Sequence, residues 1–474
     1  MKRLYGQDYV PRLLHKKTIL ISVVIFSIFL IVTQPLYRFL MPVTQLNEIT
    51  SKPAFQVYRA LTGGSHPTRT LLVFANNAEQ RIGGGFVGSV GILNGAHNRL
   101  QIESVRSIYY YDHRLEEKGA FLSAPEYLQN LTAKIYARDS LLTTSNSENS
   151  QKFRDLYARE TGEYIDNVVI ITPKVLSLLI KYIGPIDLPG YNLTITSDNI
   201  LTTLQQEVES GQDKADGRDP KAILKVLAEQ LVIRVPNLTS IQLTQLSDDI
   251  IGLMQTQQMY VYLQDHSVME KLSMYQEPIA QAGDPNTINI AVANHAANKS
   301  SQAIEQEVRV TMHISQDGMA RLSAQISRMH TSDYAGYYID PKTGQGNFLI
   351  GDDLSWVQLT LPRDTKMITG GPMKAQKEPG VFGADVSTKP LTTSKVIAEF
   401  VLPTRYAMLE QITIDETFLA QFGWLGQKVQ FKVEVPDNYR FMYGSDGVQG
   451  NFNMASRSFF QIDDEKMHFV FSKQ

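Results

Sequence analysis

The sequence predicts an α/β domain followed by an all-β, sandwich-like domain, with one transmembrane helix near the N-terminus. Three observations lead to this prediction. An uncharged, mostly apolar run lies close to the N-terminus. Short apolar runs alternate with helical patterns in the first half of the chain. After about residue 286 the hydrophobic period changes from 3.6 residues, which is typical of helices, to 2, which is typical of strands.

The composition is that of a globular protein, with 474 residues, 43% hydrophobic and 20% charged. The chain has no cysteine, which excludes disulfides, zinc–thiolate sites and a cysteine nucleophile. The net charge of −3 is unevenly spread. The first 17 residues carry Lys2, Arg3, Arg12, Lys16 and Lys17 against Asp8. This is +4, so the remainder carries −7 (−3 minus +4), and an acidic remainder excludes an electrostatic surface for nucleic acid.

Residues 18–37 are predicted to cross a membrane. The segment has no charged residue, and about 20 helical residues span the hydrocarbon core of a bilayer. The basic tail of residues 1–17 precedes it, which predicts a cytoplasmic N-terminus and an extracytoplasmic bulk anchored in the cell membrane. The alternative is a cleaved signal peptide, but no small-x-small cleavage pattern follows the segment. A connector over residues 38–68 is expected to contain one short helix.

Residues 69–285 are predicted to form the α/β domain. Its first strand is expected over 69–75, followed by a strand pair over 86–94 and 100–107 that is joined by a turn. Helices are expected over 126–136 and 151–160. The clearest unit is a strand over 166–171 and a helix that starts at Pro173 and stops at Gly184. A helix over 240–256 and a strand over 259–263 follow.

Residues 286–474 are predicted to form the β-sandwich. Strict alternation of polar and apolar residues over 307–315 leads into a Gln-Asp-Gly turn and a returning strand over 320–327. Further strands are expected over 356–361, 395–402 and 429–435. These last three are followed by prolines, which are expected to end them: Pro362, Pro403 and Pro436.

A glycine-rich loop is the main candidate for a functional site. Residues 83–88, GGGFVG, match the spacing of a dinucleotide fingerprint, but seven residues separate them from the strand before and a strand follows. A nucleotide cofactor is therefore excluded. Arg81 beside free backbone N–H groups could instead bind phosphate, since guanidinium binds oxyanions bidentately. The competing interpretation is an Arg–Glu ion pair that fixes the loop.

Several motifs resemble a bacterial membrane-anchored family known as domain of unknown function 4012. The most specific is LLVFANNAEQRIGGGFVGS, which matches that family's strand, N-x-A-E-x-R and G-G-F-x-G-S pattern. The segments ARDS, ETGEYIDNVVIITPKVLSLLIKYIGPIDLPGY and ANHAANKSS resemble later elements of the family. The loop after Arg138-Asp139 departs from the family, because SLLTTSN stands where members often have Trp and a Pro-Asp-Phe run.

The family's middle segment in turn resembles the LytR-CpsA-Psr phosphotransferases, which move glycopolymers from polyprenyl-pyrophosphate carriers onto the cell wall. That resemblance implies an α/β/α domain, polyprenyl-phosphate lipid and cell-wall polymer as partners, and Mg²⁺. It implies catalytic roles for Arg81 and Arg138, phosphate binding by Asn77, Arg81, Gly84, Gly85, Arg106 and Arg138, and Mg²⁺ binding by Glu79 and Asp139. Ser107 stands where the enzymes have an aspartate, which is a second departure.

Two functions therefore remain open from the sequence. One is a glycopolymer phosphotransferase, or a relative that binds polyprenyl-pyrophosphate sugars. The other is a non-enzymatic envelope scaffold or binding module, whose phosphotransferase-like domain is inactive. A structure in which the four residues Glu79, Arg81, Arg138 and Asp139 line an open cleft would favour the first function, and a cleft packed shut would favour the second.

Overall fold

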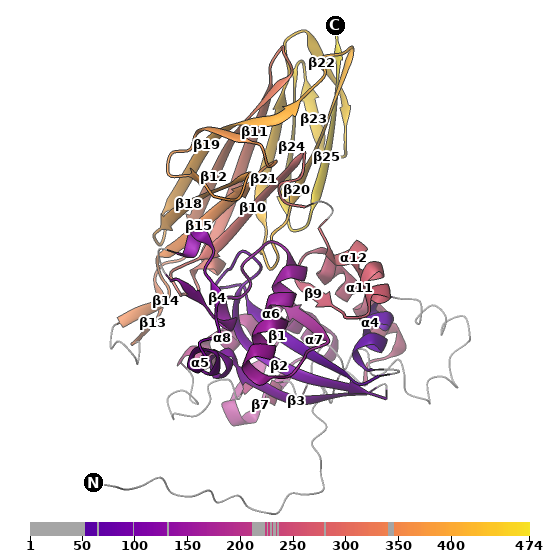
Figure 1. Ribbon diagram of the computed structural model, residues 1–474, viewed down its shortest axis with the longest axis vertical. Helices are drawn as coiled ribbons and strands as arrows, with labels where there is room; N and C mark the ends of the chain where they lie inside the picture. Colours follow the sequence, from indigo (N-terminus) through magenta and orange to yellow (C-terminus); the bar gives the residue numbers. More distant parts are fainter. Residues whose placement is uncertain are drawn as a thin grey trace, which may run out of the picture.

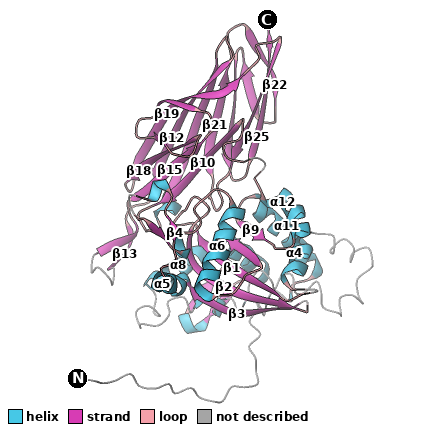
Figure 2. Cartoon of the chain, viewed as in Figure 1, coloured by secondary structure: helices cyan, strands magenta, loops and turns pink. Residues whose placement is uncertain are grey.

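The computed structural model describes residues 53–474, apart from 64–65, 98, 130–131, 211–222, 225, 228–229, 231–233, 235–236, 279–280 and 340–345. It has a mixed α/β part and a large β-sandwich that stands on one end of it (Figure 1). Within the described residues, the α-helices lie in the α/β part, and long strands fill the C-terminal half (Figure 2). This confirms an α/β fold followed by a sandwich.

A five-stranded mixed sheet forms the centre of the α/β part. Its order is β3-β2-β1-β6-β9. The strands are β1 (Thr68–Asn76), β2 (Phe86–Ala96), β3 (Arg99–Ser107), β6 (Asn167–Ile171) and β9 (Met259–Tyr262). Strands β1 and β6 are parallel, while the other neighbours are antiparallel. All five residues of β6 are buried, as expected for a strand covered on both faces.

Helices cover both faces of this sheet. On one face lie α4 (Pro53–Leu61), α7 (Pro173–Ile183), α8 (Ile200–Ser210), α11 (Ser240–Gln255) and α12 (His266–Gln276). On the other lie α5 (Ile108–Glu117) and α6 (Asn146–Thr161). Alternate side chains of β1 supply the two cores, with Leu72 facing the first group and Leu71 the second. Two short hairpin strands, β7 (Ile186–Leu188) and β8 (Leu193–Ile195), join α7 to α8 through the turn η4 (Pro189–Tyr191).

The predicted helix over residues 126–136 is wrong. The segment forms a short 3₁₀ turn, η2 (Glu126–Leu128), between two paired short strands, β4 (Leu122–Ser123) and β5 (Lys134–Ile135). Leu128 and Ile135 are buried in a small separate cluster with Ala124 and Leu142. This tertiary packing outweighs the helical pattern of the sequence. A second 3₁₀ turn, η3 (Ala137–Asp139), follows directly.

The C-terminal half is a sandwich of two seven-stranded sheets. The first sheet, in spatial order, is β17 (Lys374–Ala375), β18 (Val381–Thr388), β15 (Asp353–Thr360), β10 (Thr287–Asn294), β20 (Gln411–Leu419), β25 (Glu465–Lys473) and β22 (Tyr439–Gly444). The second is β16 (Lys366–Thr369), β19 (Thr393–Arg405), β12 (Met319–His330), β11 (Ile304–Ile314), β21 (Gln427–Glu434), β24 (Met454–Gln461) and β23 (Val448–Asn451). A hairpin of β13 (Ala335–Ile339) and β14 (Gly346–Ile350) projects beside them. The alternating burial of β11 and β12 confirms the period of 2.

One of the three predicted strand ends is wrong. Strand β15 ends at Thr360 and β21 at Glu434, in each case two residues before a proline. Strand β19 instead runs through Pro403 to Arg405. The pairing of β12 with β19 shifts register between Met319 and Arg321, opposite this point. A bulge tolerates the missing N–H of proline, so the strand continues.

The sandwich core contains a carboxyl group, Glu416 of β20, which is 2% exposed. Its hydrogen bond comes from the hydroxyl of Tyr406, 3.3 Å from Oε1. Burial raises the pKa of Glu416 from 4.5 to about 8. The folded protein therefore keeps this proton up to about pH 8, whereas the unfolded chain loses it above about pH 4.5. The free energy of unfolding consequently falls as the pH rises between these two values.

Glu416→Gln is therefore expected to stabilise the protein by about 3 kcal/mol at pH 7 and by only about 1 kcal/mol at pH 5. Urea unfolding at the two pH values measures both differences. Glu399→Gln, a change at an exposed glutamate of β19, is the matched control and should alter stability equally little at either pH. An equal effect of Glu416→Gln at both pH values would contradict the neutral state of this carboxyl group.

No helix within the described part of the chain is both long and apolar enough to cross a membrane. The predicted transmembrane helix over 18–37 and the basic tail before it lie outside the described residues.

Candidate functional site at the junction of the two parts

The loop between β1 and β2 carries the candidate site, and it lies against the sandwich. Its three glycines are each closely packed. A Cβ on Gly83 would lie 2.2 Å from the Asn149 side chain of α6, and one on Gly85 would lie 2.4 Å from the carbonyl oxygen of Asn76. Gly84 has a φ of +137°, and a Cβ on it would lie 2.7 Å from the ring of Phe422, which belongs to the sandwich. Glycine is therefore required at these three positions, because a side chain would collide with the neighbouring atoms.

The backbone N–H groups of this loop are largely engaged within the protein. Gly83 N donates to Leu141 O (3.1 Å) and Gly84 N to Arg81 O (2.9 Å). Phe86 N donates to Glu79 O (2.8 Å). These bonds stabilise a compact turn. They also occupy N–H groups that would otherwise be available to bind an anion.

Arg81 lies at the centre of the junction, and its side chain is 10% exposed. Nε donates to Asp139 Oδ1 (2.9 Å), and Nη2 lies 2.8 Å both from Glu79 Oε1 and from Asp139 Oδ1. Nη1 donates to two carbonyl oxygens, Gln80 O (3.1 Å) and Asn294 O (2.9 Å). A guanidinium has five N–H donors, so these partners account for all of them.

Two further cations and one further carboxylate complete a closed ionic network. Lys299 Nζ donates to Glu79 Oε2 (2.6 Å). Arg138 lies 3.3 Å from Asp139 Oδ2 through Nε, and 2.9 Å from Asp112 Oδ2 through Nη1. We call the six residues Glu79, Arg81, Asp112, Arg138, Asp139 and Lys299 the junction network. Three positive and three negative charges make it neutral.

The charges of the junction network stabilise one another. Burial acts to raise the pKa of Glu79, but Arg81 and Lys299 outweigh it and hold the pKa below its ordinary value. Burial acts to lower the pKa of Arg81, and the carboxylates of Glu79 and Asp139 reverse this. For Asp112, burial outweighs the partly exposed Arg138 and raises the pKa. The Glu79–Arg81 pair is thus held ionised by its partners.

Uncharged groups of the same loop also bond to the sandwich. Asn77 Nδ2 donates to Gly423 O (2.8 Å), and Gln421 Nε2 donates to Arg81 O (2.8 Å). Gln80 N donates to Ser301 Oγ (3.3 Å). The N-x-A-E-x-R loop therefore contacts two sandwich segments, 294–301 and 421–424, which lie more than 200 residues later in the chain.

The structure brings together most of the predicted site residues. Glu79, Arg81, Arg138 and Asp139 converge, and Asn77, Gly84 and Gly85 lie in the same loop. Arg106 lies apart on β3, exposed, with its guanidinium 4.3 Å above the ring of Tyr110. The phosphate-binding and catalytic roles of the predicted site residues stay predictions. No sequence pattern points to Lys299 or Asp112, although the motif ANHAANKSS contains Lys299.

The carboxylates predicted to bind Mg²⁺ do not fit a metal in this arrangement. Glu79 gives one oxygen to Arg81 and the other to Lys299, while Asp139 gives its two oxygens to Arg81 and Arg138. Mg²⁺ would have to displace these cations. No group of three or more metal-binding side chains occurs among the described residues.

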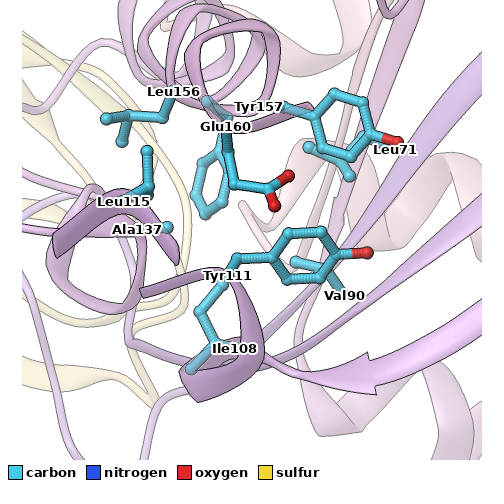
Figure 3. A pocket seen from close by; sticks show the side chains of 10 residues that line it. Leu71, Val90, Ile108, Tyr111, Leu115, Ala137, Leu156, Tyr157 and Glu160 are labelled. Atoms are coloured by element: carbon cyan, nitrogen blue, oxygen red, sulfur yellow. The ribbon is translucent and has the colours of Figure 1, made fainter. Parts of the chain in front are cut away.

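A small apolar pocket lies between the sheet and helices α5 and α6. Its walls are Leu71, Val90, Ile108, Tyr111, Leu115, Ala137, Phe153, Leu156, Tyr157 and Glu160. The Glu160 carboxylate lies between the two tyrosine rings (Figure 3), and Arg114 Nε lies 2.5 Å from its Oε1. Burial raises the pKa of Glu160. The cavity volume of about 10 Å³ has room for about one water molecule.

Comparison with solved structures gives partial matches at low similarity. The M1 zinc metallopeptidase of Deinococcus radiodurans is 9% identical over 36% of this chain and 42% of its own, with a TM-score of 0.21. The transcriptional regulator yvhJ of Bacillus subtilis is 10% identical over 39% of this chain and 96% of its own, with a TM-score of 0.17. The chain thus spans less than half of the metallopeptidase. No curated protein matches the chain.

The family comparison covers the segment that carries the junction loop. Residues 65–208, from β1 to α8, match the model described as "Protein of unknown function (DUF4012)". This segment includes Glu79, Arg81, Asp112, Arg138 and Asp139, which are five of the six residues of the junction network. Residues 65–208, within the α/β part of the chain, are therefore identified as a DUF4012 domain.

Proposed function

We propose that the chain is a membrane-anchored, extracytoplasmic envelope module whose α/β domain is a non-enzymatic scaffold for the β-sandwich. The anchor is the apolar segment of residues 18–37, and the scaffold is an α/β/α domain of the type that the LytR-CpsA-Psr resemblance implies. The single observation that supports a scaffold is that Arg81, a buried residue of the neutral junction network, makes five contacts with acceptor atoms of the protein.

This observation weighs against binding of pyrophosphate at Arg81. A phosphate ligand would have to replace two carboxylates and two carbonyl oxygens that already satisfy every donor of the guanidinium. It would also leave Glu79 with Lys299 and Asp139 with Arg138 as their remaining cations, and loss of one partner from a buried ion pair costs up to about 3–5 kcal/mol. The same contacts instead fasten the sandwich to the α/β domain, since Asn294 and Lys299 belong to the sandwich.

A second candidate is the binding of a polyprenyl-pyrophosphate sugar by the same domain. The apolar pocket between the sheet and α5 favours it, because Arg114 and the partly exposed Arg138 lie near its walls and could meet a phosphate. The pocket would have to widen, since its present volume is far below that of a prenyl chain.

One titration separates the two candidates. Farnesyl pyrophosphate, with Mg²⁺, is added to the full-length protein in detergent, and the heat of binding is measured. The scaffold predicts no saturable binding below about 1 mM, which corresponds to less than about 4 kcal/mol of affinity.

Saturable binding at lower concentration would contradict the scaffold and support the second candidate if Arg138→Met abolished it. Arg159→Met is the control, because Arg159 is an exposed arginine of α6 outside the junction network. A loss of binding in both variants would point to unspecific attraction of the anion by surface charge.

A further inference from the structure

The η2 turn of the α/β part is stacked on two aromatic rings of the sandwich. The ring of Tyr127 lies 6.0 Å from that of His295 and 5.8 Å from that of Trp356, with interplanar angles of 10° and 18°. Next to this stack, Lys377 N of the sandwich donates to Glu126 Oε2 (2.9 Å). Ring stacking and one hydrogen bond therefore connect the turn to the sandwich.

His295 is buried in this stack in a way that suits only its neutral form. Its side chain is 9% exposed, and Nε2 has no hydrogen-bond partner among the described residues. Nδ1 lies 3.8 Å from Asp385 Oδ1, beyond hydrogen-bond length, and that carboxylate is 73% exposed. Protonation would place a charge and an additional unpartnered N–H in this interface, which is costly.

Some charged groups around His295 raise its pKa and others lower it. Burial lowers its pKa and Arg81, across the junction, lowers it further. Asp385 of β18 and Asp353 of β15 act to raise it. Asp385 acts more strongly than Arg81, but burial has the largest effect, so the pKa of His295 is lowered overall. Tyr127, the titratable group stacked on the ring, is neutral, since burial raises its pKa.

We propose that protonation of His295 releases the η2 turn from the sandwich, so that the junction loosens in mildly acidic surroundings. The released imidazole reaches water and recovers its ordinary pKa of 6.5. The docked state has the lower pKa, so docking is complete well above pH 6.5 and weakens as the pH falls below it. The equilibrium constant for release should rise by up to about tenfold between pH 7.5 and pH 5.5. Such a release operates whether the α/β domain is a scaffold or an enzyme.

Hydrogen exchange at the Lys377 amide tests the proposal, because this N–H bonds across the contact to Glu126. After correction for the intrinsic pH dependence of exchange, its protection factor should fall by up to about tenfold between pH 7.5 and pH 5.5. His295→Phe keeps an aromatic ring in the stack but cannot titrate, so its protection factor should stay constant. His313→Gln, at an exposed histidine of β11, is the control and should behave as the wild type.

Quenching of Trp356 by acrylamide, in a Trp424→Phe background, gives an independent measure, since the stack buries Trp356 to 6% exposure. Quenching should increase on acidification in the wild type and not in His295→Phe. Tyr127→Ala should give strong quenching at every pH, with helix content unchanged by circular dichroism. A pH response that persists in His295→Phe, or a wild-type protection factor that does not change, would overturn the proposal.

Discussion

Replacing Arg81 with methionine is expected to lower the free energy of unfolding by about 3–5 kcal/mol. The change removes one of the two cationic partners of each of two carboxylates, Glu79 and Asp139, whose side chains are 5% and 22% exposed. It also leaves the carbonyl oxygens of Gln80 and Asn294 without this donor. Methionine has a similar length, so the loss is one of charge and hydrogen bonds more than of volume.

The same change is expected to uncouple the two parts of the molecule. Both tryptophans, Trp356 and Trp424, belong to the sandwich and lie at the junction, while the helices belong to the α/β part. Urea unfolding followed by tryptophan fluorescence and by far-ultraviolet circular dichroism should coincide in the wild type. The two curves should separate in Arg81→Met, because the junction network no longer links the parts.

Arg309→Met is the matched control for this experiment. Arg309 pairs with Glu307 on the surface of the sandwich, where the two side chains are 55% and 43% exposed. Exposed pairs contribute about 0–1 kcal/mol, so stability should hardly change. If Arg81→Met were as stable as this control, the guanidinium would be dispensable for folding. A role in binding an anion would then become the better explanation, because binding sites often reduce stability.

The secondary structure of the chain could be predicted where one pattern dominates. The strand pair β2–β3 and the hairpin β11–β12 follow from alternation and from their turn residues. The end of α7 follows from Gly184, which has a φ of +79°. The sequence pattern does not predict helix α5, although Ile108, Tyr111 and Leu115 are buried at helical spacing, because a buried aspartate and flanking tyrosines interrupt the pattern.

The residues of the candidate site could be named through the resemblance, but their arrangement could not be predicted. The resemblance implies phosphate binding by Arg81 and Arg138, and a guanidinium beside backbone N–H groups also suits phosphate. The same residue types also suit a buried ion pair. Lys299 distinguishes a buried ion pair from a phosphate site. It lies 220 positions after Glu79 and completes the neutral network. Sequence spacing carries no information on that contact.

The core of the sandwich also contains a buried ion pair, which the alternating pattern of its strands does not predict. Arg328 of β12 occupies an inward position and is 1% exposed. Its Nη2 lies 2.8 Å from Oδ1 of Asp353, a residue of β15 in the opposite sheet that is 0% exposed. Gln306 of β11 accepts from Nη1 at 2.7 Å. The pair thus joins the two sheets through a polar contact in an otherwise apolar core.

Arg328→Met is expected to lower the free energy of unfolding by about 3–5 kcal/mol, which is a large share of the total stability of a typical domain. The carboxylate of Asp353 would remain between the sheets without its cation. Urea unfolding followed by tryptophan fluorescence measures the loss. Arg405→Met, which breaks the exposed pair with Asp317, is the control and should cost less than about 1 kcal/mol.

The double variant Arg328→Met with Asp353→Leu identifies the cause of that loss. An apolar pair in place of a buried ion pair is often neutral or stabilising, so the double variant should recover most of the stability. If it were as unstable as Arg328→Met, the isolated carboxylate could not be the cause. The loss would then come from Gln306, which also donates to Gln427 of β21 (2.6 Å) and so connects the ion pair to the next strand.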